Sequence, residues 1–268
     1  MTVRTEQQEH VTTVIIDRID ARNAVDHSTA DLLTEAFLAF DADPDAHVAV
    51  FWGAGGTFCA GYDLKYAATL ADPDAFRRDF TARLDFPTTG VIPRGPMGPS
   101  RLALSKPVIA AVGAAVAGGM ELALWCDMRV MAQDSFFGVY CRRWGIPLID
   151  GGTVRLPRLV GAGRAMDIIL TGRKVPADEA LRIGLCERVV PCGSTRTAAE
   201  DLAREIARFP QAAVRADRRS AYESFGLGTR EALAQEWAGG IDAFMLEGAA
   251  GAARFAQGRG RQGDFQDI

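Results

Sequence analysis

Histidine and cysteine are scarce in this chain, and neither occurs in a pattern typical of a metal or disulfide site. Among 268 residues there are three histidines, all in the first fifth of the chain, and five cysteines. The cysteines are odd in number and scattered, without the paired spacing of a zinc site or a disulfide framework. We therefore expect no metal site, and thiols that are reduced and mostly buried.

The chain also lacks a strong excess of charge and a long apolar run. Its formal net charge of -4 provides no general attraction for nucleic acid or an anionic membrane. The longest apolar stretch, residues 108–120, is too short to span a bilayer and is closed by Glu121. Residues 1–10 lack the basic and then apolar order of a secretory signal. We expect a cytoplasmic protein without nucleic-acid or membrane partners.

The composition that remains is that of a globular protein, with 48% hydrophobic and 24% charged residues. Short β patterns alternate with helical ones, which indicates an α/β fold. Strands are predicted at 11–16, 47–52, 108–112 and 187–190, and helices at 28–40, 151–160, 164–170 and 177–183. A loop rich in Gly and Pro at 87–99 is of the kind that covers a site.

The C-terminal part of the sequence differs from the rest. From Thr195 onward almost every segment predicts helix, interrupted at Pro210, at 226–228 and at Gly248. We accordingly divide the chain into a core, residues 1–194, that carries the binding site, and a helical region, residues 195–268, that packs on a neighbouring subunit.

Two glycine-bearing turns give the clearest indication of a binding site. Each follows a predicted strand and opens a helix: GAGGTFCAGYDLK at 53–65 and VGAAVAGGMELALWCD at 112–127. The first does not complete a dinucleotide fingerprint, because Phe58 stands where the last glycine belongs. Gly118 allows a ligand to approach helical N–H groups that lack partners. If the turn at Gly61 lies beside it, two N–H groups can converge on one oxygen and stabilise an oxyanion. Either turn alone is more often a tight connection that lets a helix pack on a strand.

Together these turns resemble a known family. FCAGYDL at 58–64 and AGGMELALWCDMR at 117–129 resemble the two signature regions of the crotonase, or enoyl-CoA hydratase and isomerase, superfamily. Further matches in the family's order are RNAVD at 22–26, SKPVIAA at 105–111, GGTVRLP at 151–157 and LTGRK at 170–174. The resemblance implies an α/β fold built as a spiral of ββα units, followed by a C-terminal helical trimerisation region. It also implies a homotrimer or a homohexamer.

The same resemblance implies an acyl-CoA thioester as ligand, with no cofactor apart from the coenzyme A of the substrate. The thioester carbonyl would accept hydrogen bonds from the backbone N–H groups of Tyr62 and Gly118. The residues implied in CoA and substrate binding are Ala60, Tyr62, Asp63, Leu64, Lys65, Gly118 and Cys141. Lys65 would lie near the phosphates as a mobile point charge, and a solvated lysine on a helix face is the alternative.

Chemistry at such a site also needs groups that move protons. Glu121 follows Gly118 by three positions, so on a helix it faces the same side as the turn, although an acidic residue there also simply favours the helix N-terminus. Many hydratases of the superfamily have a second glutamate where this sequence has Cys141, and a thiol, mostly neutral at its usual pKa of about 8.5, replaces it poorly. Asp150 matches an acidic residue of the dienoyl-CoA isomerase and dehalogenase branches, or is the N-cap of the helix at 151.

Three functions follow from these residues. The first is an enoyl-CoA hydratase, a lyase, with Glu121 as acid and base. The second is an enoyl- or dienoyl-CoA isomerase that uses Glu121 and Asp150. The third, from another class, is a non-catalytic acyl-CoA binding protein. A nucleophilic role for Cys141 is disfavoured because no histidine has a recognisable partner position.

Overall fold

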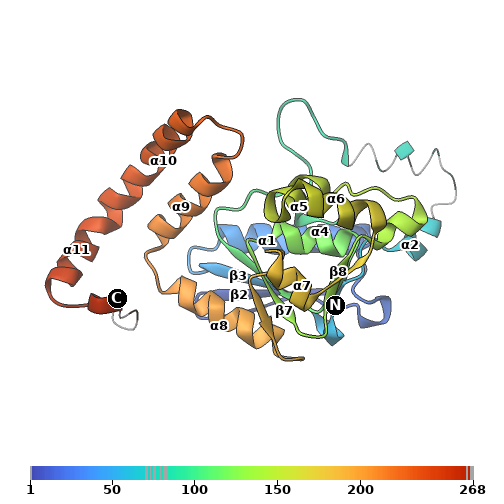
Figure 1. Cartoon of the computed structure of the whole chain (residues 1–268), viewed down its shortest axis with the longest axis horizontal. Coiled ribbons are helices and arrows are strands. Elements are labelled where there is room, and N and C mark those ends of the chain that lie inside the picture. Colours follow the sequence, from blue (N-terminus) through green and yellow to red (C-terminus); the bar gives the residue numbers. More distant parts are fainter. Residues whose placement is uncertain are drawn as a thin grey trace.

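The computed structural model describes residues 2–69, 72, 74, 77, 78, 80, 84–263 and 265 (Figure 1). Its core contains two β-sheets. The larger has the order β1 (Val3–Gln8), β2 (Val11–Ile16), β3 (Val48–Gly53), β5 (Val108–Val112), β7 (Met128–Ala132) and β10 (Arg188–Val190). The smaller has the order β4 (Thr57–Cys59), β6 (Ala114–Val116), β8 (Phe136–Gly138) and β9 (Lys174–Pro176). Only β1 and β9 pair antiparallel with their neighbours among these strands.

From β3 to β8, successive strands alternate between the two sheets. In the pairs β3–β4, β5–β6 and β7–β8, the first strand joins the large sheet and the second joins the small one. The first two pairs lead into helices α2 (Leu64–Thr69) and α4 (Gly118–Trp125). The expected α/β fold with repeated ββα units is therefore confirmed. Strands β4 and β6 are parallel neighbours. The turns that follow these two strands therefore lie side by side.

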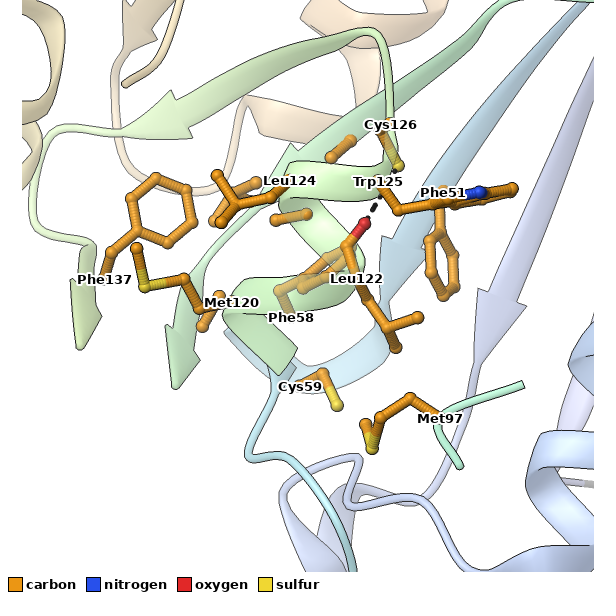
Figure 2. Packing of buried hydrophobic residues seen from close by; sticks show 14 of the residues in the cluster. Phe51, Phe58, Cys59, Met97, Met120, Leu122, Leu124, Trp125, Cys126 and Phe137 are labelled. Atoms are coloured by element: carbon orange, nitrogen blue, oxygen red, sulfur yellow. Dashed lines mark hydrogen bonds between the residues drawn. The ribbon is translucent and has the colours of Figure 1, made fainter. Parts of the chain in front are cut away.

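Helix α4 lies at the centre of the core. All of its residues are buried, and all except Glu121 are apolar, as expected for a helix in the centre of a core. Figure 2 shows apolar side chains on several sides of this helix, with Cys59 and Met97 beyond its first turn. A Cβ on Gly119 would lie 2.0 Å from the carbonyl oxygen of Cys59, so glycine is required where α4 starts against β4.

Helices α1 (His27–Ala42), α7 (Ala177–Arg182) and α8 (Thr195–Ala207) pack against strands of the sheets. Helices α5 (Gly152–Val160) and α6 (Ala162–Thr171) pack on each other, and α5 also packs on α4. Helix α8 packs Ala199 and Leu202 against Val50 and Ile109 of the large sheet. No helix in the described part of the chain is both long and apolar enough to cross a membrane.

Helices α9 (Gln211–Glu223), α10 (Thr229–Ala243) and α11 (Ala249–Ala256) extend away from the sheets (Figure 1). The predicted helical C-terminal region is present, and the domain division after residue 194 stays a prediction. The interruptions at Pro210 and at 226–228 separate helices, as expected. The predicted interruption at Gly248 is wrong. The backbone of Gly248 is helical (φ −65°, ψ −38°), and a π-helical turn, Phe244–Gly248, joins α10 to α11.

Candidate active site

The two glycine-bearing turns meet at the small sheet. A Cβ on Gly61 would lie 3.1 Å from the amide nitrogen of Gly118 and 3.0 Å from the Cβ of Ala117. Gly61 also has φ +95°, a conformation that L side chains rarely adopt. The close approach of the two turns therefore depends on glycine at this position.

The N–H groups of Tyr62 and Gly118 are both available to a ligand. Val25 donates to the carbonyl of Gly61 (2.9 Å) and accepts from the N–H of Asp63 (2.9 Å), which turns the intervening N–H of Tyr62 away from this pairing. Gly118 is the first residue of α4, so its N–H has no intrahelical acceptor. Within the described residues neither group donates to the protein. Together they form a candidate oxyanion hole.

Ala117, which precedes Gly118, has a strained backbone. Its φ of 53° and ψ of −128° are unusual for a residue with a side chain, at a cost of about 1–3 kcal/mol. The N–H of Ala117 donates to the carbonyl of Gly138 on β8 (2.8 Å), which helps to hold this conformation. The strain occurs where the chain turns from β6 into α4, directly at the candidate oxyanion hole.

Glu121 is buried in the first turn of α4, and its carboxylate reaches the start of another helix. Oε1 accepts from the N–H groups of Asp150 (2.9 Å) and Gly152 (2.8 Å). The pKa of Glu121 is raised to about 7, first by burial and then by the charge of Asp150, while the two N–H bonds oppose the shift. In the described part of the chain Oε2 has no partner. Glu121 therefore has one fixed oxygen and one free oxygen, and it exchanges a proton near neutral pH.

Asp150 is equally buried, with 3% of its surface exposed. Its Oδ1 accepts from the N–H of Met97 (3.0 Å) and from the hydroxyl of Ser100. The alternative role of Asp150 as a helix N-cap is wrong, because Gly151 occupies the N-cap of α5 and no side chain bonds there. Burial raises the pKa of Asp150, and the bonds from Ser100 and Met97 oppose this.

Cys141 lies in a short 3₁₀ helix, Tyr140–Trp144, directly after β8, and is buried. Burial raises the pKa of its thiol, and the charge of Glu121 raises it further, so the two side chains are close enough to interact. The thiol of Cys141 is therefore neutral at physiological pH. The structure joins Glu121 of α4 to the segment of Asp150 through the N–H of Asp150 (2.9 Å), and the charge of Glu121 acts on Cys141 from a third segment.

The segment after Tyr62 has a structural role that its sequence did not reveal. Asp63 Oδ1 accepts from the N–H groups of Lys65 (3.0 Å) and Tyr66 (3.1 Å) and so caps α2, while its Oδ2 pairs with Arg18 (3.0 Å). Arg18 also pairs with Asp26 at the start of α1 (3.0 Å). These charges fix the turn that carries the N–H of Tyr62.

The other predicted ligand-binding residues flank this turn. The N–H of Ala60 donates to the carbonyl of Arg22 (3.0 Å). Leu64 and Lys65 are exposed at the start of α2. Among the described residues the Lys65 ammonium makes no ion pair. It is thus free to reach an anionic ligand, although its exposed position is equally that of a solvated lysine.

The sequence around this site matches a known protein family. The model of the enoyl-CoA hydratase/isomerase family matches residues 6–90 and 100–242, which include both turns and both carboxyl groups. The chain belongs to the enoyl-CoA hydratase/isomerase family. The resemblance to the crotonase superfamily is thereby confirmed.

Relatives within the family support the assignment at the level of whole chains. Enoyl-CoA hydratase EchA19 of Mycobacterium tuberculosis is 35% identical over 263 residues, covering 95% of this chain and 93% of that protein. Carnitinyl-CoA dehydratase of Proteus mirabilis is 39% identical over 219 residues, covering 78% of each. The crystal structure of enoyl-CoA hydratase EchA1 from Mycobacterium marinum has a TM-score of 0.84 and 33% identity, and covers 96% of both chains.

Proposed function

We propose that this family member adds water to the double bond of an α,β-unsaturated acyl-CoA, with Glu121 as the acid and base. The observation that carries the proposal is a buried carboxyl group with a pKa of about 7 one turn after an unpartnered helix N–H. The names of its relatives, two hydratases and a dehydratase, agree with this chemistry.

In the proposed reaction the N–H groups of Tyr62 and Gly118 donate to the thioester oxygen. Negative charge moves onto that oxygen as water attacks the β carbon, and each donor contributes about 3–4 kcal/mol to stabilising the transition state. Glu121 takes one proton from the attacking water and returns a proton to the α carbon, so the product is a 3-hydroxyacyl thioester. Asp150 orients the water through the carboxyl oxygen that Ser100 and Met97 leave unused. The neutral thiol of Cys141 moves no proton.

The decisive experiment follows the absorbance of the conjugated enoyl thioester when crotonyl-CoA is mixed with the protein. Wild type should consume the signal, and Glu121→Gln should lower kcat by about 10²–10⁴-fold because it cannot exchange a proton. Glu9→Gln, in the exposed β1–β2 turn, is the matched control and should behave as wild type. Absence of turnover in wild type, or full activity in Glu121→Gln, would contradict the proposal.

Isomerisation is the second candidate, and Cys141 favours it, because a neutral thiol stands where many hydratases have their second glutamate. Glu121 and Asp150 would then move a proton between two carbons without adding water. A product with a shifted double bond and no hydroxyl group would identify this reaction. The non-catalytic alternative is not retained, since the family members compared above carry the names of enzymes.

The proposed assembly is a homotrimer or a homohexamer formed through the C-terminal helices. Support comes from large apolar side chains exposed on α10 and the π-helical turn: Leu233, Trp237, Phe244, Met245 and Leu246. Such a concentration on one segment is typical of a protein–protein interface. We further propose that the reaction takes place in the cytoplasm and needs no cofactor apart from the coenzyme A of the substrate.

A further inference from the structure

Arg155, on the first turns of α5, joins the two segments that hold Asp150. Its Nη1 donates to the carbonyl of Asp150 (2.9 Å) and its Nη2 donates to the carbonyl of Ser100 (2.8 Å). The hydroxyl of Ser100 in turn donates to Oδ1 of Asp150. Ser100 and Asp150 are thus linked through their backbones by Arg155 and through their side chains directly.

Two glycines make room for this network. A Cβ on Gly151 would lie 2.0 Å from Nη1 of Arg155, and a Cβ on Gly95 would lie 1.9 Å from Oγ of Ser100 and 2.6 Å from Oδ1 of Asp150. Gly151 has φ +97°, so the chain can turn there before α5 begins. Gly151 therefore leaves room for the guanidinium group of Arg155, and Gly95 leaves room for the bond between Ser100 and Asp150.

The positive charge of Arg155 lies close enough to the buried carboxyl groups of Glu121 and Asp150 to lower both of their pKa values. It favours the ionised forms of both Glu121 and Asp150, against the burial that raises both pKa values. Arg101 adds to this effect at Asp150. Arg155 is itself partly buried and lies near Tyr222 of α9 as well as the two carboxyl groups. Arg155 thus acts on both members of the pair.

We propose that Arg155 is a positioning residue for catalysis, which aligns Asp150 through Ser100 and holds one negative charge on the Glu121–Asp150 pair. Arg155 acts through these groups and not by contact with the reacting atoms. The inference rests on the proposed function, because it assigns Arg155 a part in the same proton transfer.

The test measures kcat, KM and the pH profile of crotonyl-CoA hydration for Arg155→Met, Arg155→Lys and Ser100→Ala. Arg155→Met should lower kcat by about 10- to 100-fold with little change in KM, because Asp150 loses its alignment. The acidic limb of its profile should move up by about one pH unit, because a nearby positive charge is removed. Arg155→Lys keeps the positive charge but cannot donate to both carbonyl groups. It should therefore return the acidic limb of the pH profile to its wild-type position without restoring kcat.

The matched control is Arg158→Met, which removes an exposed arginine one turn further along α5 that stacks on Phe225. It should leave kcat and the pH profile unchanged. An unchanged profile in folded Arg155→Met, or the same shift in Arg158→Met, overturns the inference. If Arg155→Met does not fold, Ser100→Ala decides, since it removes a bond that favours ionised Asp150 and must move the limb in the same direction.

Failure of the proposed function is recognised separately. If wild type does not turn over crotonyl-CoA, the proposed hydration fails, and the pH dependence of the free energy of unfolding replaces the activity profile. Arg155→Met must then steepen the loss of stability between acid and neutral pH, because its carboxyl pKa values lie higher. Parallel stability curves for Arg155→Met and wild type would overturn the inference.

Discussion

Among single residues, Glu121 is one whose proposed role in proton transfer lowers the stability of the folded protein, because it buries an ionisable carboxyl group. Its carboxyl group is 3% exposed, accepts two N–H groups through one oxygen and leaves the other without a partner. Ionising a buried carboxyl group requires more free energy than ionising an exposed one, because burial removes the water that stabilises the charge. Because the pKa lies at about 7 and not at its ordinary 4.5, the folded protein retains a proton that the unfolded chain releases.

This difference makes stability dependent on pH. The contribution of protonated Glu121 is fully present below pH 4.5 and is lost as the pH rises through about 7. Glu121→Gln remains neutral and keeps an acceptor for both N–H groups. It should therefore raise the free energy of unfolding by about 3 kcal/mol at pH 8 and have little effect at pH 4.

Urea denaturation at a series of pH values measures this gain. Glu9→Gln, which alters an exposed glutamate, should show no such pH-dependent gain. A constant difference between Glu121→Gln and wild type across the pH range would show that the pKa of Glu121 is not raised.

At the scale of the elements, the parallel pairing of β4 with β6 brings the two N–H donors together. The turn after β4 requires Gly61 for two reasons, its positive φ and the nearness of Ala117 and Gly118. These reasons can be separated experimentally, because Gly56 in the preceding turn also has positive φ, +83°, yet a Cβ there meets no atom within 4 Å.

Gly61→Ala should push the turn of Tyr62 away from Gly118 and weaken the oxyanion hole. We expect kcat/KM to fall by about 10²–10³-fold, comparable to the loss of one oxyanion donor. Gly56→Ala imposes the same kind of backbone strain without this contact, so it should lower stability by about 1 kcal/mol and leave kcat/KM unchanged. Equal losses of activity in the two variants would show that the spacing of the turns is not what matters.

The elements also show how far the sequence predicted the structure. Runs of apolar residues located β2 and β5, and the glycines located both turns of the site. Strand β1 escaped prediction because VRTEQQ is largely polar and mostly exposed, so it has no buried face to detect. Strands β4, β6, β8 and β9 have three residues each, too few to show a period.

Contacts between distant segments were beyond the reach of local patterns. The neighbours of Asp150 in the sequence predict a possible N-cap, whereas its partners Met97 and Ser100 lie 53 and 50 residues away. Arg155 lies within the matched GGTVRLP segment, but its bond to Ser100 spans 55 residues. The loop at 87–99 did indicate that a site would be covered, and Met97 of that loop lies against Gly118.

At the scale of the whole molecule, hydrogen bonds between side chains hold helix α9 to the core. Arg218 and Tyr222 both donate to Oδ1 of Asp127 (2.8 Å each), directly after α4. The apolar side chains of α10 have no such cover within the described residues, and Trp237 is 69% exposed. The proposed trimer would bury them.

Trp237→Asp should therefore weaken assembly while leaving the core folded. Light scattering coupled to size-exclusion chromatography should show a shift from an oligomer toward the monomer mass, because a charge would be buried without a partner. Leu38→Asp is the control, since it places the same charge on an exposed leucine of α1. An unchanged oligomer in Trp237→Asp would remove α10 from the interface.

The separation of the site into main-chain and side-chain parts has a consequence for how such proteins diverge. The two proposed oxygen-binding N–H groups belong to the backbone, so substitution of Tyr62 by most other residues leaves that N–H in place. The proposed proton-handling groups, Glu121 and Asp150, are side chains on two different segments, so each can be replaced without the other. A gene duplicate can thus change its chemistry by single substitutions while it inherits thioester binding intact.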